Sequence, residues 1–173
     1  MHNFHLGIDV AKAKLDCALR GPDGKLRHKV VPNTPAGFDA LLAWAGKQGA
    51  HSFHACMEAT GIYWEAVALF LAEHGFTVSV LNPAQIKAFG ASRMVRTKTD
   101  RVDAGLIAAF CHERQPAPWQ APSASVQTLR ALVSRLEALQ NMRTQESNRL
   151  EVARAPVRDG IETHLQWLED EIK

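Results

Sequence analysis

The order of the apolar segments constrains the fold of this chain more than any other feature of its sequence. Three early segments have strand character, and the GPDG turn between the second and the third predicts a β-hairpin. Two more strand-like segments follow, each after a segment with helical spacing, which is typical of parallel βαβ units. Strands are expected at 4–10, 14–20, 25–31, 51–58 and 76–83, and helices at 35–48, 62–75, 84–93 and 100–114. The chain is therefore predicted to form an α/β domain with a mixed five-stranded sheet and flanking helices. Thr60 is predicted to cap the helix at 62–75.

The composition is that of an ordinary globular protein. Of the 173 residues, 46% are hydrophobic and 22% are charged, and the net charge of +2 permits nucleic-acid binding without requiring it. The sequence begins without a signal-peptide pattern and contains no run as long as a membrane span, so we expect a cytoplasmic protein without a membrane partner. Cys17, Cys56 and Cys111 form no CxxC pattern and are expected to be buried, reduced thiols. The eight histidines show no compelling ligand spacing.

A proline-rich segment divides the chain. RQPAPWQAPSAS, at 114–125, carries three prolines and predicts a boundary, with a domain at 1–115, a linker at 116–124 and a helical segment at 125–173. Apolar residues recur along that segment on both sides of Pro156, at Leu129, Leu132, Leu136 and Leu139 and then at Ile161, Leu165, Leu168 and Ile172. Such narrow stripes predict a helical hairpin or coiled coil that makes a homodimer or a higher even oligomer. The alternative is a helix folded back on its own domain.

Four acidic residues stand in apolar surroundings. Asp100 and Asp103 share one helix face with Ile107 and Phe110, although acids in a first helical turn can also simply cap the helix. Asp9 and Glu58 belong to two apolar strands. In an α/β sheet, strand ends and the start of a packed helix meet at one edge, so the four acids are expected to converge. Their mutual repulsion then calls for divalent cations, and hard oxygen ligands favour Mg²⁺ or Mn²⁺. Two such ions about 4 Å apart would suit phosphodiester chemistry.

Basic residues lie beside the second pair of acids. The cations expected to hold a nucleic-acid backbone through its phosphates are Lys12, Arg93, Arg96, Lys98 and Arg101. The alternative is a solvated basic loop and a surface lysine.

Motifs along the chain, taken together, resemble a known family. They are GIDVAK (7–12), MEATGIYW (57–64), VLNPAQIKAF (80–89) and KTDRVDA (98–104). Residues 4–115 resemble the DEDD-motif transposases of bacterial insertion sequences, the Piv/MooV-type recombinases. The resemblance implies a ribonuclease-H-like, RuvC-like fold, with Asp9, Glu58, Asp100 and Asp103 as the catalytic and metal-binding acids. It also implies DNA as a substrate, an element-encoded guide RNA and a bacterial, nucleoid-associated protein.

The resemblance leaves alternatives open. Family members continue into a second domain with a nucleophilic serine and a glycine-proline motif, which this sequence does not contain before it ends at Lys173. The leading interpretation is therefore the N-terminal catalytic domain of a transposase, and this chain alone is not expected to complete strand exchange. A free-standing RuvC-like nuclease or junction resolvase is one alternative, and a non-catalytic nucleic-acid-binding fragment is another. An actin-like or sugar-kinase-like domain is disfavoured, because Val10, Ala11 and Lys12 replace the glycine-rich phosphate turn of those proteins.

Overall fold

The computed structural model describes residues 2–94 and 99–173, and of Asp100 it describes only the backbone. The chain forms two compact units, Met1–Ala121 and Pro122–Lys173, which are described separately.

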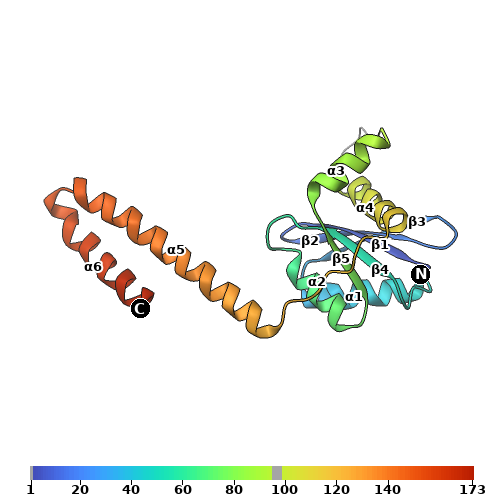
Figure 1. The fold of residues 1–173 in the computed structure, drawn as a ribbon, viewed down its shortest axis with the longest axis horizontal. Coiled ribbons are helices and arrows are strands. Elements are labelled where there is room, and N and C mark those ends of the chain that lie inside the picture. The colour runs from blue at the N-terminus through green and yellow to red at the C-terminus, as the bar shows by residue number, and fades with distance from the viewer. Residues whose placement is uncertain (1, 95–98) are drawn as a thin grey trace. The chain divides into compact units, whose positions relative to one another are not determined.

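The first unit is built on a mixed five-stranded sheet (Figure 1). Its strands are β1 (His5–Val10), β2 (Lys14–Arg20), β3 (Leu26–Pro32), β4 (His54–Glu58) and β5 (Thr77–Leu81). They lie in the order β3-β2-β1-β4-β5. The pairs β1–β2 and β2–β3 are antiparallel, whereas β1–β4 and β4–β5 are parallel. The predicted antiparallel hairpin leading into parallel βαβ units is therefore confirmed.

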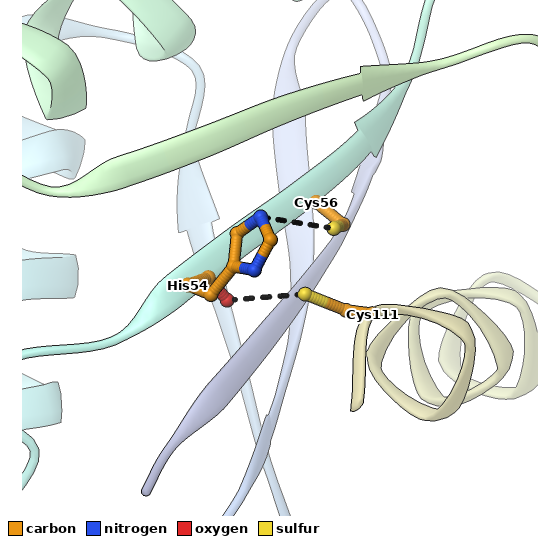
Figure 2. Close-up of side chains that lie close together, drawn as sticks. All are labelled: His54, Cys56 and Cys111. Carbon is orange, nitrogen blue, oxygen red and sulfur yellow. Dashed lines mark hydrogen bonds between the residues drawn. The ribbon is translucent and has the colours of Figure 1, made fainter. Parts of the chain in front are cut away.

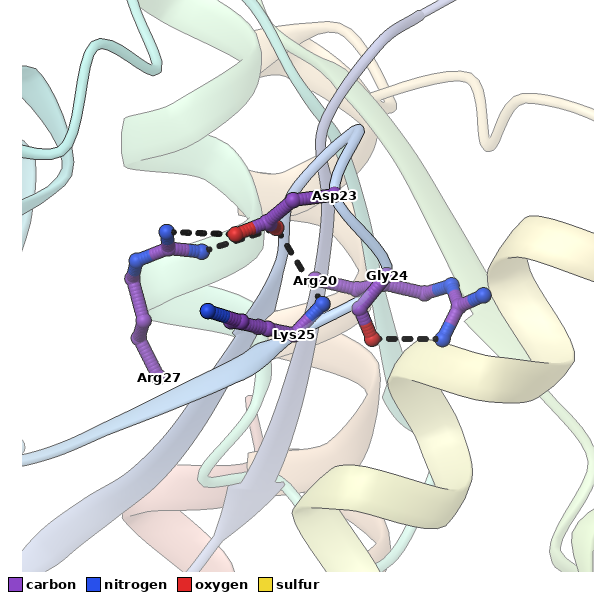
Figure 3. Close-up of polar contacts among 5 residues, drawn as sticks. All are labelled: Arg20, Asp23, Gly24, Lys25 and Arg27. Carbon is purple, nitrogen blue, oxygen red and sulfur yellow. Dashed lines mark hydrogen bonds and ion pairs between the residues drawn. The ribbon is translucent and has the colours of Figure 1, made fainter.

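The turn between β2 and β3 shows why the GPDG sequence makes a hairpin (Figure 3). Gly24 has a positive φ of 74°, a conformation that glycine adopts without steric cost. Asp23 accepts a hydrogen bond from the backbone N–H of Lys25 at 3.1 Å and pairs with Arg27 at 3.0 Å. Arg20 closes the turn by donating to the carbonyl of Gly24 at 3.1 Å. These contacts in the turn fix the register in which β2 and β3 pair.

Helices cover both faces of the sheet (Figure 1). α1 (Pro35–Lys47) and α2 (Glu65–Glu73) pack on the face that carries Leu6 and Ile8. α3 (Pro83–Ser92) and α4 (Asp100–Arg114) pack on the opposite face. The alternation of side chains along a strand explains this division, because successive residues of β1 point to opposite faces.

The start of α2 differs from the prediction. Thr60 was expected as its cap, but α2 begins at Glu65 after Trp64. Gly61 has a positive φ of 63°, and its carbonyl accepts a hydrogen bond from the indole N–H of Trp64 at 3.0 Å. This local turn occupies the residues between Glu58 and the helix, and the prediction for Thr60 was wrong.

Gly7 lets α4 approach the sheet closely. A Cβ added there would lie 2.1 Å from the carbonyl oxygen of Ala104 and 2.3 Å from the backbone nitrogen of Ala108. Both neighbours are backbone atoms of α4, so a side chain could be accommodated only by moving the helix.

We expect Gly7→Ala to destabilise the first unit by at least about 3 kcal/mol, the upper end of the usual cost of overpacking. Urea unfolding followed by circular dichroism measures the change. Gly46→Ala is the matched control, because the nearest atom to a Cβ there is a His51 ring atom at 3.9 Å. That control should stabilise α1 by roughly 0.5–1 kcal/mol, as alanine does in a helix interior. Equal stabilities for the two variants would contradict the close packing of α4 on β1.

The second unit is a helical hairpin. α5 (Ala124–Val152) and α6 (Ala155–Ile172) pack against each other, and Leu139 and Leu168 are buried between them. The chain turns at Ala153 and Arg154, just before Pro156. A proline fits there because it stands in the first helical turn, where its missing N–H costs no hydrogen bond.

Candidate metal and nucleic-acid site

Asp9 and Glu58 are neighbours at the carboxyl ends of the two central parallel strands. The register of β1 and β4 pairs Ile8 with Met57, and Asp9 and Glu58 follow directly on the two strands. Asp9 stands two residues beyond Gly7, and Glu58 stands two residues beyond Cys56. Gly7 lies against α4 and Cys56 packs in the core beneath it, so alternation places both acids on the face that α4 covers. Both residues are half-buried.

The direction of α4 brings its first turn to the same end of the sheet. At the amino end of β1, the His5 ring lies 4.8 Å from that of His112, near the end of α4. In mid-strand, Gly7 lies against Ala104 and Ala108. α4 therefore runs antiparallel to β1. Two strand residues span about 6.6 Å, which corresponds to roughly four to five helical residues. By this spacing Asp9 is level with the first turn of α4.

Asp103 lies in that first turn and is half-buried. Of its predicted partners on the same helix face, Ile107 and Phe110 are buried. Thr99 is the N-cap of α4, and its hydroxyl accepts a hydrogen bond from the backbone N–H of Val102 at 3.3 Å. Thr99 is therefore the residue that caps α4. The alternative in which Asp103 serves only as the cap has no support. The side chain of Asp100 is outside what the structure describes.

Asp16 is a further acid that the sequence reading did not single out. Its Cα pairs with that of Asp9 across β1 and β2, so the two side chains share a face of the sheet. Asp16 is only 8% exposed and forms an ion pair with Lys14 at 2.9 Å. Together with Arg101 it lines a pocket of about 160 Å³. The signal in the sequence was weak, because a single acid that alternates with apolar residues is ordinary in a strand.

The predicted cations have different surroundings. Lys12 and Arg101 are exposed, Lys12 in the loop after β1 and Arg101 in the first turn of α4. Arg93 forms an ion pair with Glu113 and lies over the Phe89 ring at 4.7 Å. Arg96 and Lys98 lie outside the described residues.

A second polar cluster lies on the same face of the sheet, between the first half of β4 and α4 (Figure 2). Among the described residues, one ligand atom each from His54, Cys56 and Cys111 lie within 4.8 Å of one another, and all three residues are buried. The Cys111 thiol donates to the His54 carbonyl at 3.4 Å. Burial raises the pKa of the Cys56 thiol, whereas the hydrogen bond from Cys56 lowers the pKa of Cys111.

The sequence reading expected buried thiols but found no metal spacing among the histidines and cysteines. The pair His54 and Cys56 was a detectable signal, since residues two apart on a strand share a face. Cys111 comes from a distant helix, and no local spacing could have associated it with the pair.

The second unit exposes an apolar stripe. α5 has 29 residues and α6 has 18, so α6 covers only part of its partner. In the first half of α5, Leu129 is 60% exposed, Leu132 63% and Leu136 39%. The predicted stripe is thus buried at Leu139 and exposed before it.

Comparison with protein families decides what kind of chain this is. The model of the DEDD transposase family of the IS110 group, described as a transposase, matches residues 6–153. The chain belongs to this transposase family. It is also 30% identical over 174 aligned positions to the pilin gene-inverting proteins of Moraxella bovis and Moraxella lacunata. These alignments include 99% of this chain but 54% of each relative, so the chain spans about half the length of the curated relatives it matches.

A solved structure supports the fold of this transposase-family chain. Thermus thermophilus RuvC, in a structure titled as a complex with a Holliday junction substrate, matches with a TM-score of 0.50 and 16% identity. The match covers 68% of this chain and 99% of RuvC. The predicted RuvC-like fold is therefore confirmed. Within the described residues, every helix is too short or too polar to cross a membrane.

Proposed function

We propose that residues 1–115 form the metal-dependent catalytic domain of a transposase and act on DNA strands during transposition. The observation that carries this proposal is that Asp9 and Glu58 occupy adjacent positions at one end of the sheet, level with the first turn of α4. The family model, named for a DEDD motif, adds weight to Asp9, Glu58, Asp100 and Asp103 as the four acids. Titration of the wild-type chain and of Asp9→Asn with Mn²⁺ tests the acid site.

The residues present fit a divalent metal. Carboxylate oxygens at a half-buried strand end are the ligands that Mg²⁺ and Mn²⁺ prefer. Asp9, Glu58 and Asp103 would hold the ion, together with Asp100. A bound divalent ion would supply charge neutralisation at the scissile phosphate. The chain's own part is to fix the acids on a rigid sheet and helix and to hold the DNA backbone beside them.

Exposed cations near the acids are positioned to bind the DNA backbone. In this proposal Lys12 and Arg101 contact phosphates directly. Arg96 and Lys98 are candidates from the sequence alone, and Arg93 pairs with Glu113 in the last turn of α4, away from the acids at the first turn. The ion pair with Glu113 neutralises part of the charge of Arg93, so Arg93 contributes less than Arg101.

The double variant Lys12→Gln and Arg101→Gln should weaken binding to unrelated DNA sequences alike. Each lost phosphate contact should reduce the slope of log affinity against log salt by about 1. Fluorescence anisotropy over a salt series measures that slope. Lys47→Gln is the control, because Lys47 is exposed at the end of α1, on the other face of the sheet. A slope that equals the wild-type slope in the double variant would remove these residues from the binding surface.

A second candidate function is a free-standing junction resolvase, which the fold match to RuvC favours. The two functions differ in what this chain does alone. A resolvase cuts a four-way DNA junction symmetrically when Mg²⁺ is added, whereas a transposase domain that needs further parts does not. Incubation of the 173-residue chain with a labelled junction and Mg²⁺ separates them.

The proposal also assigns oligomerisation to the helical unit. Residues 125–173 hold a homodimer or a higher even oligomer, because the exposed leucines of α5 need a cover. An element-encoded guide RNA is the remaining partner, and it follows from the family resemblance alone. Copurified nucleic acid that is degraded by RNase and survives DNase would support it.

A further inference from the structure

We propose that His54, Cys56 and Cys111 form a binding site for Zn²⁺ that pins α4 to β4. His54 is the first residue of β4, and Cys56 is at the middle of that strand, paired with Gly7 of β1. Cys111 lies near the C-terminal end of α4. The acids Asp9 and Glu58 lie further along, at the carboxyl ends of the strands. This inference does not depend on the proposed function.

The backbone itself aims the three side chains at one point (Figure 2). His54 and Cys56 are two residues apart on β4, so both point toward α4. Cys111 reaches down from α4, where its thiol contacts the His54 carbonyl at 3.4 Å. His54 Nε2 lies 3.9 Å from the Cys56 sulfur. The ligands thus come from both β4 and α4, so a bound metal would connect the helix to the sheet.

The spacing suits a tetrahedral zinc ion. With Zn–S bonds of about 2.3 Å, two sulfur ligands lie roughly 3.8 Å apart. The three ligand atoms already lie within 4.8 Å of one another, so small side-chain rotations bring them to bonding distance. Thiolate and imidazole ligands select zinc over magnesium and manganese, which the acids at the other end prefer.

The charge balance also suits a buried site. His54 is 3% exposed, and Cys56 and Cys111 are fully buried. Two thiolates and a neutral imidazole around Zn²⁺ carry no net charge, which avoids the high cost of burying an isolated ion. The two thiol protons leave as the metal enters.

The Ser79 hydroxyl lies beside the imidazole of His54. Its Oγ lies 2.8 Å from His54 Nε2, and its hydroxyl donates to the Ala117 carbonyl at 2.8 Å. The fourth position of a tetrahedral zinc ion is then open to a water molecule, as in other sites with three protein ligands.

Histidines mark a route from the surface to the site. The His54 ring lies 5.9 Å from that of His2 and 6.5 Å from that of His5. His5 in turn lies 4.8 Å from His112, which is exposed at the end of α4. These imidazoles offer temporary ligands along the path of an entering ion.

The experiment uses the complete, reduced chain and Co²⁺ as a spectroscopic probe, in excess Mg²⁺ to occupy oxygen sites. We expect one Co²⁺ per chain with the intense thiolate-to-cobalt absorption, and its displacement by Zn²⁺. Cys56→Ala and Cys111→Ala should each weaken binding by more than about 100-fold, since even outer-shell changes cost 10–100-fold. Zn²⁺ should also raise the Tm of the wild type.

Cys17→Ala is the matched control, because Cys17 is a buried thiol of the same unit that packs in the core on the other face. It should keep both the cobalt absorption and the Tm increase. His54→Gln removes the imidazole without removing a thiol and provides a second test if a cysteine variant fails to fold. A folded wild type without thiolate-to-cobalt absorption would overturn the site, as would variants of Cys56 and Cys111 that bind like Cys17→Ala.

Discussion

Asp9→Asn is expected to lower the affinity of the chain for Mn²⁺ by more than about 100-fold, because removal of a ligand should exceed the 10–100-fold cost of outer-shell changes. The fold should survive, since asparagine has nearly the same shape as aspartate. Isothermal titration with Mn²⁺, or the electron paramagnetic resonance signal of free Mn²⁺, measures the affinity. Glu58→Gln and Asp103→Asn should behave in the same way, because all three acids belong to the proposed site.

The same variant should have the opposite effect on the metal-free protein. Asp9 and Glu58 lie on one face of the sheet at adjacent strand ends, so removal of one charge relieves their mutual repulsion. The Tm without metal should rise in Asp9→Asn, and the increase in Tm on addition of Mn²⁺ should disappear. A general packing defect would instead lower the Tm in both conditions, so the two readouts separate a metal site from a structural role.

Asp39→Asn is the matched control for this experiment. It removes the same charge from an exposed position on α1, which packs on the other face of the sheet. Mn²⁺ affinity should then stay at the wild-type value. Equal affinities for wild type, Asp9→Asn and Asp39→Asn would reject the acid site, although the fold and the family would stand.

The sequence predicted the sheet well because its signals are local. Alternation in FHLGIDV, the GPDG turn and the punctuation by Gly75 and Pro83 each act within a few residues. The start of α2 was missed because a turn at Gly61, closed by the Trp64 indole, competes with the cap that Thr60 could have made. The preference of threonine for cap positions does not predict whether another local contact will form in place of the cap.

The candidate sites depended on contacts between distant residues. The expectation that the four acids converge came from the topology of an α/β sheet, which brings strand ends together. Asp16 was missed because its proximity to Asp9 depends on the exact register of β1 and β2. Cys111 was missed because only the packing of α4 brings it to His54 and Cys56. Register and helix direction are global properties, and no window of sequence contains them.

The register also gives the α4-covered face two chemically distinct ends. Gly7 lies between them, where the backbone of α4 touches the sheet. Carboxylates lie at the carboxyl ends of β1 and β4, whereas the imidazole of His54 lies at the amino end of β4 and the Cys56 thiol at its middle. A metal at one end is therefore expected to affect the other through the position of α4. Hard and soft ligands keep the two metal preferences apart.

The double variant Leu129→Ser and Leu132→Ser is expected to convert an oligomer of this chain to monomers. Both leucines are more than half exposed, at 60% and 63%, on the part of α5 that extends beyond α6. Covering each would contribute roughly 1 kcal/mol, given 1.5–3 kcal/mol for full burial of a leucine. A symmetric dimer contains each residue twice, so the double variant removes about 4 kcal/mol, or a thousandfold in Kd.

Light scattering and analytical ultracentrifugation over a range of concentrations measure this change. Val152→Ser is the control, because Val152 is 83% exposed at the other end of α5, beside the turn into α6. It should leave the oligomer intact, since a single exposed valine outside the stripe contributes little. The hairpin itself should persist in both variants, because Leu139 and Leu168 stay buried between α5 and α6. A wild-type chain that is monomeric at tens of micromolar would reject the dimer, and the exposed leucines of α5 would then need a different partner.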